Sequence, residues 1–129
     1  TVVTEPTVSN TTTDVVDWNE ALRTAGGNRK LLTEIVEAFL EESRRLMKAM
    51  LEAVEQGDMA TLERSAHTLK SAARYFGANH ASETALRLEL MGRDRQLPHV
   101  REGLAELEGE LENLTKVLVD YCEGKVEIQ

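Results

Sequence analysis

Hydrophobic residues recur every three to four positions along most of the chain, the spacing that gathers them on one face of an α-helix. Glycines and capping residues interrupt this pattern at intervals. The interruptions predict a short helix from Asp17 to the Gly26-Gly27 pair, followed by four longer helices. We expect the longer helices to lie between Asn28 and Gly57, between Asp58 and Gly77, between Asn79 and Gly92, and from Pro98 to about residue 123.

The last of these helices has the clearest pattern, with steps that alternate between four and three residues. Its apolar residues are Val100, Leu104, Leu107, Leu111, Leu114, Leu118 and Tyr121. Short loops between long amphipathic helices favour antiparallel neighbours. The sequence therefore predicts an all-α fold, an antiparallel up-down four-helix bundle with a short extra N-terminal helix. We expect the bundle to span residues 17–123, with a flexible, Thr-rich linker or tail at 1–16 and a C-terminal tail at 124–129.

Composition limits the classes of function. The chain has 129 residues, about one domain, and a formal net charge of −8, which argues against general nucleic-acid binding. No apolar run is long enough to span a bilayer, so we expect no membrane contact by this domain. The single cysteine, Cys122, cannot form an internal disulfide, which fits a reducing compartment and a cytoplasmic location.

One histidine, His67, falls on the side of its predicted helix that is expected to face solvent. With Leu62 as the origin of a helical wheel, the apolar residues of the third helix centre near roughly 10° and His67 falls near roughly 140°. An exposed neutral imidazole is a good nucleophile, and histidine is largely neutral near pH 7. Lys70 lies one turn away on the same exposed flank, where it could neutralise part of a phosphoryl charge. Cys122 is expected to be partly buried and inert.

The stretch AHTLKSAARYFGA, residues 66–78, closely resembles the signature of histidine phosphotransfer domains of bacterial phosphorelays. Those domains have Ala-His, a Lys three residues after the His, small residues next, and then Gly-Ala. The resemblance implies that His67 is the phosphoacceptor and Lys70 the phosphate-facing cation, and that Gly77 and Ala78 shape the turn into the next helix. Ser71 departs from the Gly that is frequent in the family, although it is still small.

The resemblance also implies a mechanism and partners. A receiver domain's phospho-aspartate would pass its phosphoryl group to His67, and His67 would pass it on to another response-regulator receiver. We expect the receiver to dock around His67, over Glu63, Arg64, Ser71 and Arg74. No cofactor of the domain's own is expected, since Mg²⁺ would come with the receiver. The Thr-rich segment fits tethering to a larger hybrid sensor histidine kinase, and a stand-alone shuttle stays open.

The alternative is a helical interaction or scaffold module without phosphoryl transfer. ATP-dependent kinase activity is not expected, because no Gly-rich nucleotide loop occurs, so the chain would be a carrier. Three scattered histidines and one cysteine predict no metal site. His80 and His99 lie at helix starts without matching neighbours, and we interpret them as incidental surface residues.

Overall fold

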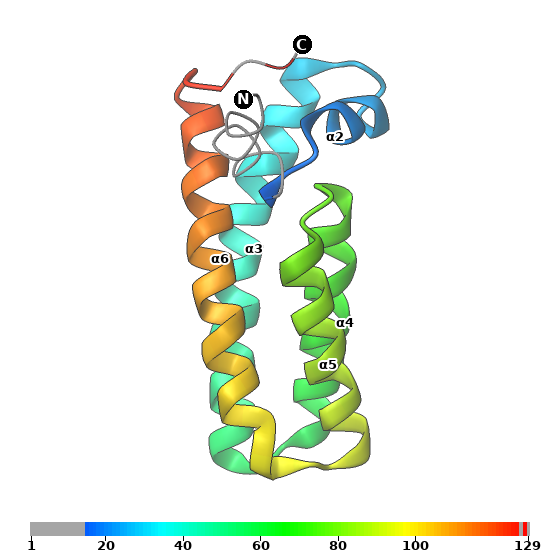
Figure 1. Ribbon diagram of the computed structural model, residues 1–129, viewed down its shortest axis with the longest axis vertical. Helices are drawn as coiled ribbons and strands as arrows, with labels where there is room; N and C mark the ends of the chain where they lie inside the picture. The colour runs from blue at the N-terminus through cyan, green and yellow to red at the C-terminus, as the bar shows by residue number, and fades with distance from the viewer. Residues whose placement is uncertain (1–14, 127, 129) are drawn as a thin grey trace, which may run out of the picture.

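The computed structural model describes residues 15–126 and residue 128. Within this part of the chain the secondary structure is helical, which confirms the predicted all-α fold (Figure 1). Its elements are α2 (Trp18–Thr24), α3 (Arg29–Gln56), α4 (Met59–Tyr75), α5 (Asn79–Asp94), the short 3-10 helix η1 (Leu97–His99) and α6 (Val100–Cys122). None of these helices is long and apolar enough to cross a membrane.

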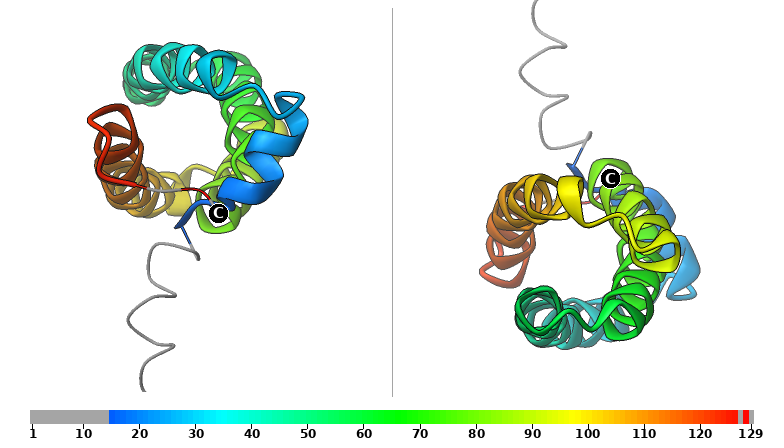
Figure 2. Two further views of the ribbon diagram at one scale, coloured as in Figure 1. Left: turned by 90° about the horizontal axis from the view of Figure 1, so that it is seen from above. Right: turned by 90° about the horizontal axis from the view of Figure 1, so that it is seen from below.

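The four long helices form a ring, seen end-on in Figure 2. Each helix runs antiparallel to the one before it in the chain (Figure 1). Helix α3 contacts α4 and α6, and α5 contacts the same two helices, so the ring closes around one core. Helix α2 lies across the end of the bundle where α3 begins, against α3 and α4.

Three predicted caps begin helices as expected. The side chains of Asp17, Asn28 and Asp58 accept hydrogen bonds from the backbone N–H groups three residues later, at 3.1, 3.0 and 3.1 Å. Each bond satisfies one of the amide groups that the first turn of a helix leaves unpaired. These local signals explain why the starts of α2, α3 and α4 could be read from the sequence.

The predicted end of α5 at Gly92 is wrong, because the helix continues to Asp94 and its left-handed cap is Arg95. Gly92 instead lies buried against the first turns of α4. A Cβ atom at Gly92 would lie 3.0 Å from the backbone nitrogen of Glu63 and 3.1 Å from the carbonyl oxygen of Met59. The missing side chain therefore lets the backbones of α4 and α5 approach closely.

The predicted limits of the domain, residues 17 and 123, are too narrow at both ends. Val16 is buried and Val15 packs against the core, so the described part of the predicted 1–16 tail, residues 15 and 16, belongs to the bundle. At the other end Ile128 is buried, and its carbonyl accepts a hydrogen bond from Nη2 of Arg29 at 3.0 Å. Isolated apolar residues have no periodicity, which is why the sequence did not reveal these contacts. Residues 1–14 of the predicted tail lie outside the described residues.

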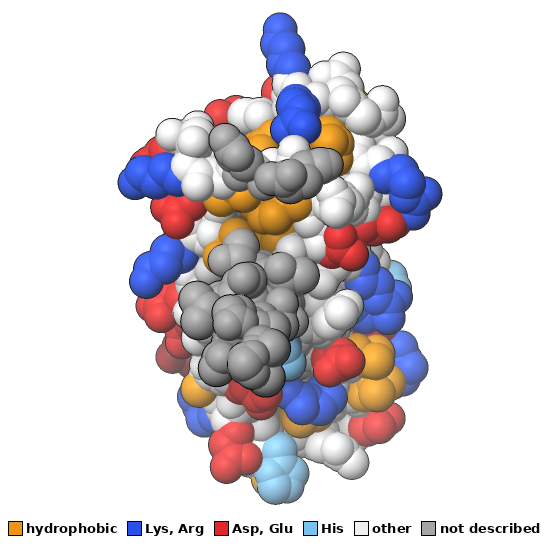
Figure 3. All heavy atoms as spheres, turned by 45° about the horizontal axis from the view of Figure 1, so that its top comes forward, with side chains coloured by type: hydrophobic (Ala, Val, Ile, Leu, Met, Phe, Trp, Pro, Cys, Tyr) orange, Lys and Arg blue, Asp and Glu red, His pale blue; other side chains and the backbone are white. Residues whose placement is uncertain are grey.

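Charged side chains cover much of the outside of the bundle. On the face shown in Figure 3, acidic and basic side chains are interspersed, and hydrophobic side chains gather near the end that carries α2. Interspersed charges of both signs are typical of a solvated surface. The site described next depends instead on a small set of charges between α4 and α5.

Candidate functional site

His67 lies in the middle of α4, on the side of the helix that faces away from the core. Its side chain keeps 58% of its surface exposed, whereas Leu62, Ala66 and Leu69 of the same helix are completely buried. The helical-wheel prediction that His67 points into solvent is therefore confirmed. An exposed imidazole on a rigid helix is accessible to a reacting partner.

Glu89 of α5 contacts His67 across the boundary between α4 and α5. Its Oε2 atom lies 2.9 Å from Nδ1 of His67, and its side chain is 6% exposed. An ionised carboxylate can only accept hydrogen bonds, so Nδ1 carries a proton and donates the hydrogen bond to Glu89. In the neutral ring the lone pair is then on Nε2, the nitrogen that this hydrogen bond does not use.

Lys70 is not on the exposed flank where we expected it. Its side chain is buried, and its Nζ atom donates a hydrogen bond to Oε1 of Glu89 at 2.7 Å. The close approach of α5, which Gly92 permits, covers this side of α4. A helical wheel of α4 alone contains no information on how closely the next helix packs.

Opposing effects act on the carboxyl group of Glu89. Burial alone would raise its pKa, but the hydrogen bonds from Lys70 and His67, together with the charge of Lys70, hold the pKa below its usual range. The group is therefore ionised near neutral pH. A buried anion thus accepts hydrogen bonds from two side chains of α4.

Arg93 adds a second cation to this cluster. Its Nη2 atom lies 3.3 Å from Oε2 of Glu89, one turn earlier on α5, and its Nε atom donates to Oε2 of Glu63 on α4 at 3.1 Å. Glu63, one of the predicted docking residues, is therefore already in an ion pair. Arg93 links α5 to α4 just as Glu89 does, and together they fix the register of the two helices beside His67.

A shallow hollow opens beside the imidazole. It is lined by Ala60, Glu63, Arg64, His67, Thr68 and Glu89. Arg64 is exposed, and its Nη2 atom donates to the hydroxyl of Thr61 at 3.2 Å. The hollow gives a group attached to the ring room on the side toward the start of α4.

Residues 34–116, more than half of the chain, match the model of the Hpt domain family. The chain belongs to the Hpt domain family. This confirms the resemblance to histidine phosphotransfer domains, and Hpt domains transfer phosphoryl groups in phosphorelays with response-regulator receiver domains. A comparison with curated proteins and one with solved structures found no match.

The other predicted docking residues of this Hpt domain lie one and two turns beyond His67. Ser71 and Arg74 are both exposed. Ser71 borders an apolar groove between α3 and α4, whose lining is Ile35, Ala38, Phe39, Glu42, Ser71, Ala72, Tyr75 and Phe76. His67 therefore lies between the hollow toward the start of α4 and this groove toward its end.

Gly77 and Ala78 form the turn from α4 to α5, where the sequence placed them. Gly77 has a φ of 64°, and a Cβ at this position would lie 2.6 Å from the Cβ of Asp17. Glycine is needed for both the backbone conformation and the space. Ala78 is buried, so the turn packs against the core of the Hpt domain.

Glu89 and Arg93 are the residues of this cluster that the sequence did not identify as site residues. One signal was present, because Glu89 is a charged residue flanked on the same helical face by Ala85 and Gly92, both buried. A carboxylate on the buried face of an amphipathic helix needs a partner. The sequence cannot show which cation supplies it, since Lys70 and Glu89 are 19 residues apart.

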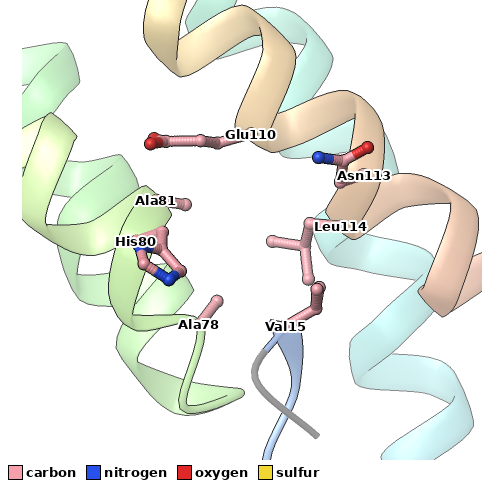
Figure 4. Close-up of a pocket in the computed structure, with 7 residues that line it drawn as sticks. All are labelled: Val15, Ala78, His80, Ala81, Glu110, Asn113 and Leu114. Atoms are coloured by element: carbon pink, nitrogen blue, oxygen red, sulfur yellow. The ribbon is translucent and has the colours of Figure 1, made fainter. Parts of the chain in front are cut away.

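The other two histidines and Cys122 lie outside this cluster. His80 is exposed at the start of α5 and lines a pocket between α5 and α6, opposite Glu110, Asn113 and Leu114 (Figure 4). His99 faces Glu102 at 3.7 Å. Cys122 is exposed, not partly buried as expected. Among the described residues, no group of three or more His, Cys, Asp or Glu could hold a metal ion.

Proposed function

We propose that Nε2 of His67 accepts a phosphoryl group from the phospho-aspartate of one receiver domain and donates it to the aspartate of another. The observation that carries this proposal is the hydrogen bond between Nδ1 of His67 and the buried, ionised Glu89. It leaves the lone pair on the other ring nitrogen, Nε2, of a side chain that is 58% exposed, and it holds the ring in one orientation. A nucleophile that is already oriented loses little freedom when the partner arrives.

The transfer step needs no base from the Hpt domain. The Nε2 lone pair forms the new P–N bond, the P–O bond to the aspartate breaks, and its electrons remain on the aspartate carboxylate. Nδ1 keeps its proton throughout, so the phosphorylated ring is an imidazolium whose positive charge faces Glu89. Onward transfer reverses these bond changes, and a neutral imidazole leaves. Glu89 thus favours the charged ring in both directions.

The receiver would dock over α4 with His67 near the centre of the contact. The apolar groove beside Ser71 and Ala72 offers a surface for apolar side chains, and Arg64 and Arg74 are charged residues on either side. A docked receiver can bring the Mg²⁺ that this chain is not expected to hold.

The cellular location of the domain and its attachment to other domains are also proposals. We propose a cytoplasmic phosphorelay in which the domain is tethered to a hybrid sensor histidine kinase, and a stand-alone shuttle is the alternative arrangement. The single cysteine and the resemblance to relay components support this setting. Mapping the neighbouring genes and the full-length chain distinguishes the two arrangements.

Phosphoryl transfer separates this function from that of a scaffold module. A panel of receiver domains phosphorylated on their aspartates is incubated with the wild type, with His67→Gln and with His80→Gln as the control. We expect an acid-labile label on the wild type and on His80→Gln, and none on His67→Gln. Label retained by His67→Gln would contradict the proposed phosphoacceptor. If no receiver in the panel labels the wild type, the result favours the scaffold function.

A further inference from the structure

We infer that Arg64, and not Lys70, is the cation that binds the phosphoryl oxygens once His67 is phosphorylated. Lys70 then acts as a positioning residue that holds Glu89 against the imidazole. The inference rests on the proposed phosphorylation of His67 and adds a residue for binding of the transferred group.

The first argument is the direction of the imidazole. Side chains on an α-helix lean toward its N-terminus, so the ring of His67 lies over the preceding turn of α4. That is the side on which the hollow opens, and Arg64 borders it while Lys70 does not. Because Nδ1 is hydrogen-bonded to Glu89, a phosphoryl group forms on Nε2, and the hollow beside the ring has room for it.

The second argument is the present partners of the three nearby cations. The ammonium of Lys70 is buried on Glu89 at 2.7 Å, and Arg93 holds both Glu63 and Glu89. Turning either cation toward a phosphoryl group would leave a half-buried or buried carboxylate without that cation, which is costly. These two cations therefore already form the ion pairs that hold α4 and α5 together.

Arg64 takes no part in the ion pairs between α4 and α5. Its guanidinium contacts the neutral hydroxyl of Thr61 at 3.2 Å, and that hydroxyl donates to Oδ2 of Asp58 at 2.6 Å. Among the described residues, Arg64 therefore meets a carboxylate only indirectly, through this hydroxyl, and the exposed Asp58 keeps its hydrogen bonds from Thr61 if Arg64 turns away. Exchanging this hydroxyl for a phosphoryl dianion replaces a neutral hydrogen bond with a stronger charge-assisted one. Arg64 and His67 are three residues apart, with Cβ atoms about 5–6 Å from each other, and the planar guanidinium can meet two phosphoryl oxygens.

The test uses phosphoramidate, a small anionic donor, so that no receiver contributes to the result. Nε2 attacks the phosphorus, the P–N bond of phosphoramidate breaks, and ammonia leaves. We compare the labelling rates of the wild type, Arg64→Gln, Arg64→Lys and Arg44→Gln. Arg44 is exposed in a groove between α3 and α6, so its substitution removes the same charge elsewhere. The Nε–H resonance of Arg64, assigned by its loss in Arg64→Gln, is followed by NMR before and after labelling.

We expect Arg64→Gln to be labelled about three- to tenfold more slowly and Arg44→Gln to match the wild type. Arg64→Lys should recover part of the rate, because an ammonium keeps the charge but not the planar contact with two oxygens. The Arg64 resonance should move on phosphorylation. An unchanged rate for Arg64→Gln would overturn the inference. So would a slower rate with an unmoved resonance, which would limit Arg64 to attracting the donor. If the wild type took no label on His67 either from phosphoramidate or from the receiver panel, the proposed function itself would fail.

Discussion

Glu89 is the residue on which the geometry around His67 depends. It contributes both of its oxygens, Oε2 to His67 and Oε1 to Lys70, from a helix that follows α4 in the chain. Burial of a carboxylate is unfavourable unless its hydrogen bonds are satisfied, so these contacts also stabilise the packing of α4 on α5. The same side chain therefore links folding to the orientation of the reactive ring.

The pH dependence of stability tests this role of Glu89. Folding lowers its pKa, so the ionised carboxylate stabilises the fold above the pKa of an unfolded glutamate, about 4.3, and this contribution is lost as the pH falls below that value. At pH 7 we expect Glu89→Gln to lower the free energy of unfolding by about 3 kcal/mol, the lower end for a broken buried ion pair. The difference from the wild type should shrink below about pH 4.

Urea denaturation at several pH values measures this difference. Glu52→Gln is the matched control, because Glu52 is exposed on α3 and forms no ion pair among the described residues. Its effect should stay within about 0.5 kcal/mol at every pH. A Glu89→Gln protein as stable as the wild type at pH 7 would show that the ion pair contributes nothing net to the fold.

At the scale of a single residue, the sequence identified the reactive group but not its support. The position of His67 follows from the periodicity of α4 alone, so a helical wheel was sufficient. The burial of Lys70 depends on α5, and a wheel of one helix cannot include a second helix. The sequence therefore placed Lys70 in solvent, although its ammonium is held by Glu89.

Among the elements, the contact between α4 and α5 is the one that positions the site. Gly92 lies one turn after Glu89, and the backbone of α4 passes so close to it that even a methyl group would be 3.0 Å from the nitrogen of Glu63. The sequence signal at Gly92 was interpreted as a helix end, because glycine is common there. Close helix packing uses the same residue type, and local sequence does not distinguish the two roles.

A pair of glycine substitutions tests this contact. Gly92→Ala adds a methyl group against a backbone, and we expect overpacking of about 1–3 kcal/mol to outweigh the helix-propensity gain of about 1 kcal/mol. Gly109→Ala is the control within α6, where a Cβ would meet nothing within 4 Å. That substitution should stabilise the protein by about 0.5–1 kcal/mol. Thermal melting of both variants measures the effect, and a stabilised Gly92→Ala would contradict the close approach.

For the molecule as a whole, the sequence predicted the all-α class and the order of the helices, but it set the limits of the packed domain too narrowly. Val16 and Ile128 both contact the core from outside the predicted residues 17–123. Neither belongs to a periodic run, so each contact depends on how the ends of the chain return to the bundle. At the N-terminal end this return is fixed by the backbone N–H of Asp17, which donates to the carbonyl of Phe76 at 2.7 Å.

Substitution and truncation at the N-terminus test where the packed domain begins. Val16 is 1% exposed, so Val16→Ala removes two buried methyl groups, and we expect a loss of about 1–3 kcal/mol. For a chain of 129 residues that corresponds to a fall in melting temperature of several degrees, about 4 °C for each kcal/mol. A chain that starts at Asp14 keeps Val15, Val16 and the Asp17 cap, and it should melt with the parent because residues 1–13 lack helical periodicity. Differential scanning calorimetry of the three proteins measures both effects. If Val16→Ala had the same melting temperature as the parent, the packing of Val16 would contribute nothing to stability. If the chain starting at Asp14 had a lower melting temperature than the parent, residues 1–13 would have to stabilise the bundle.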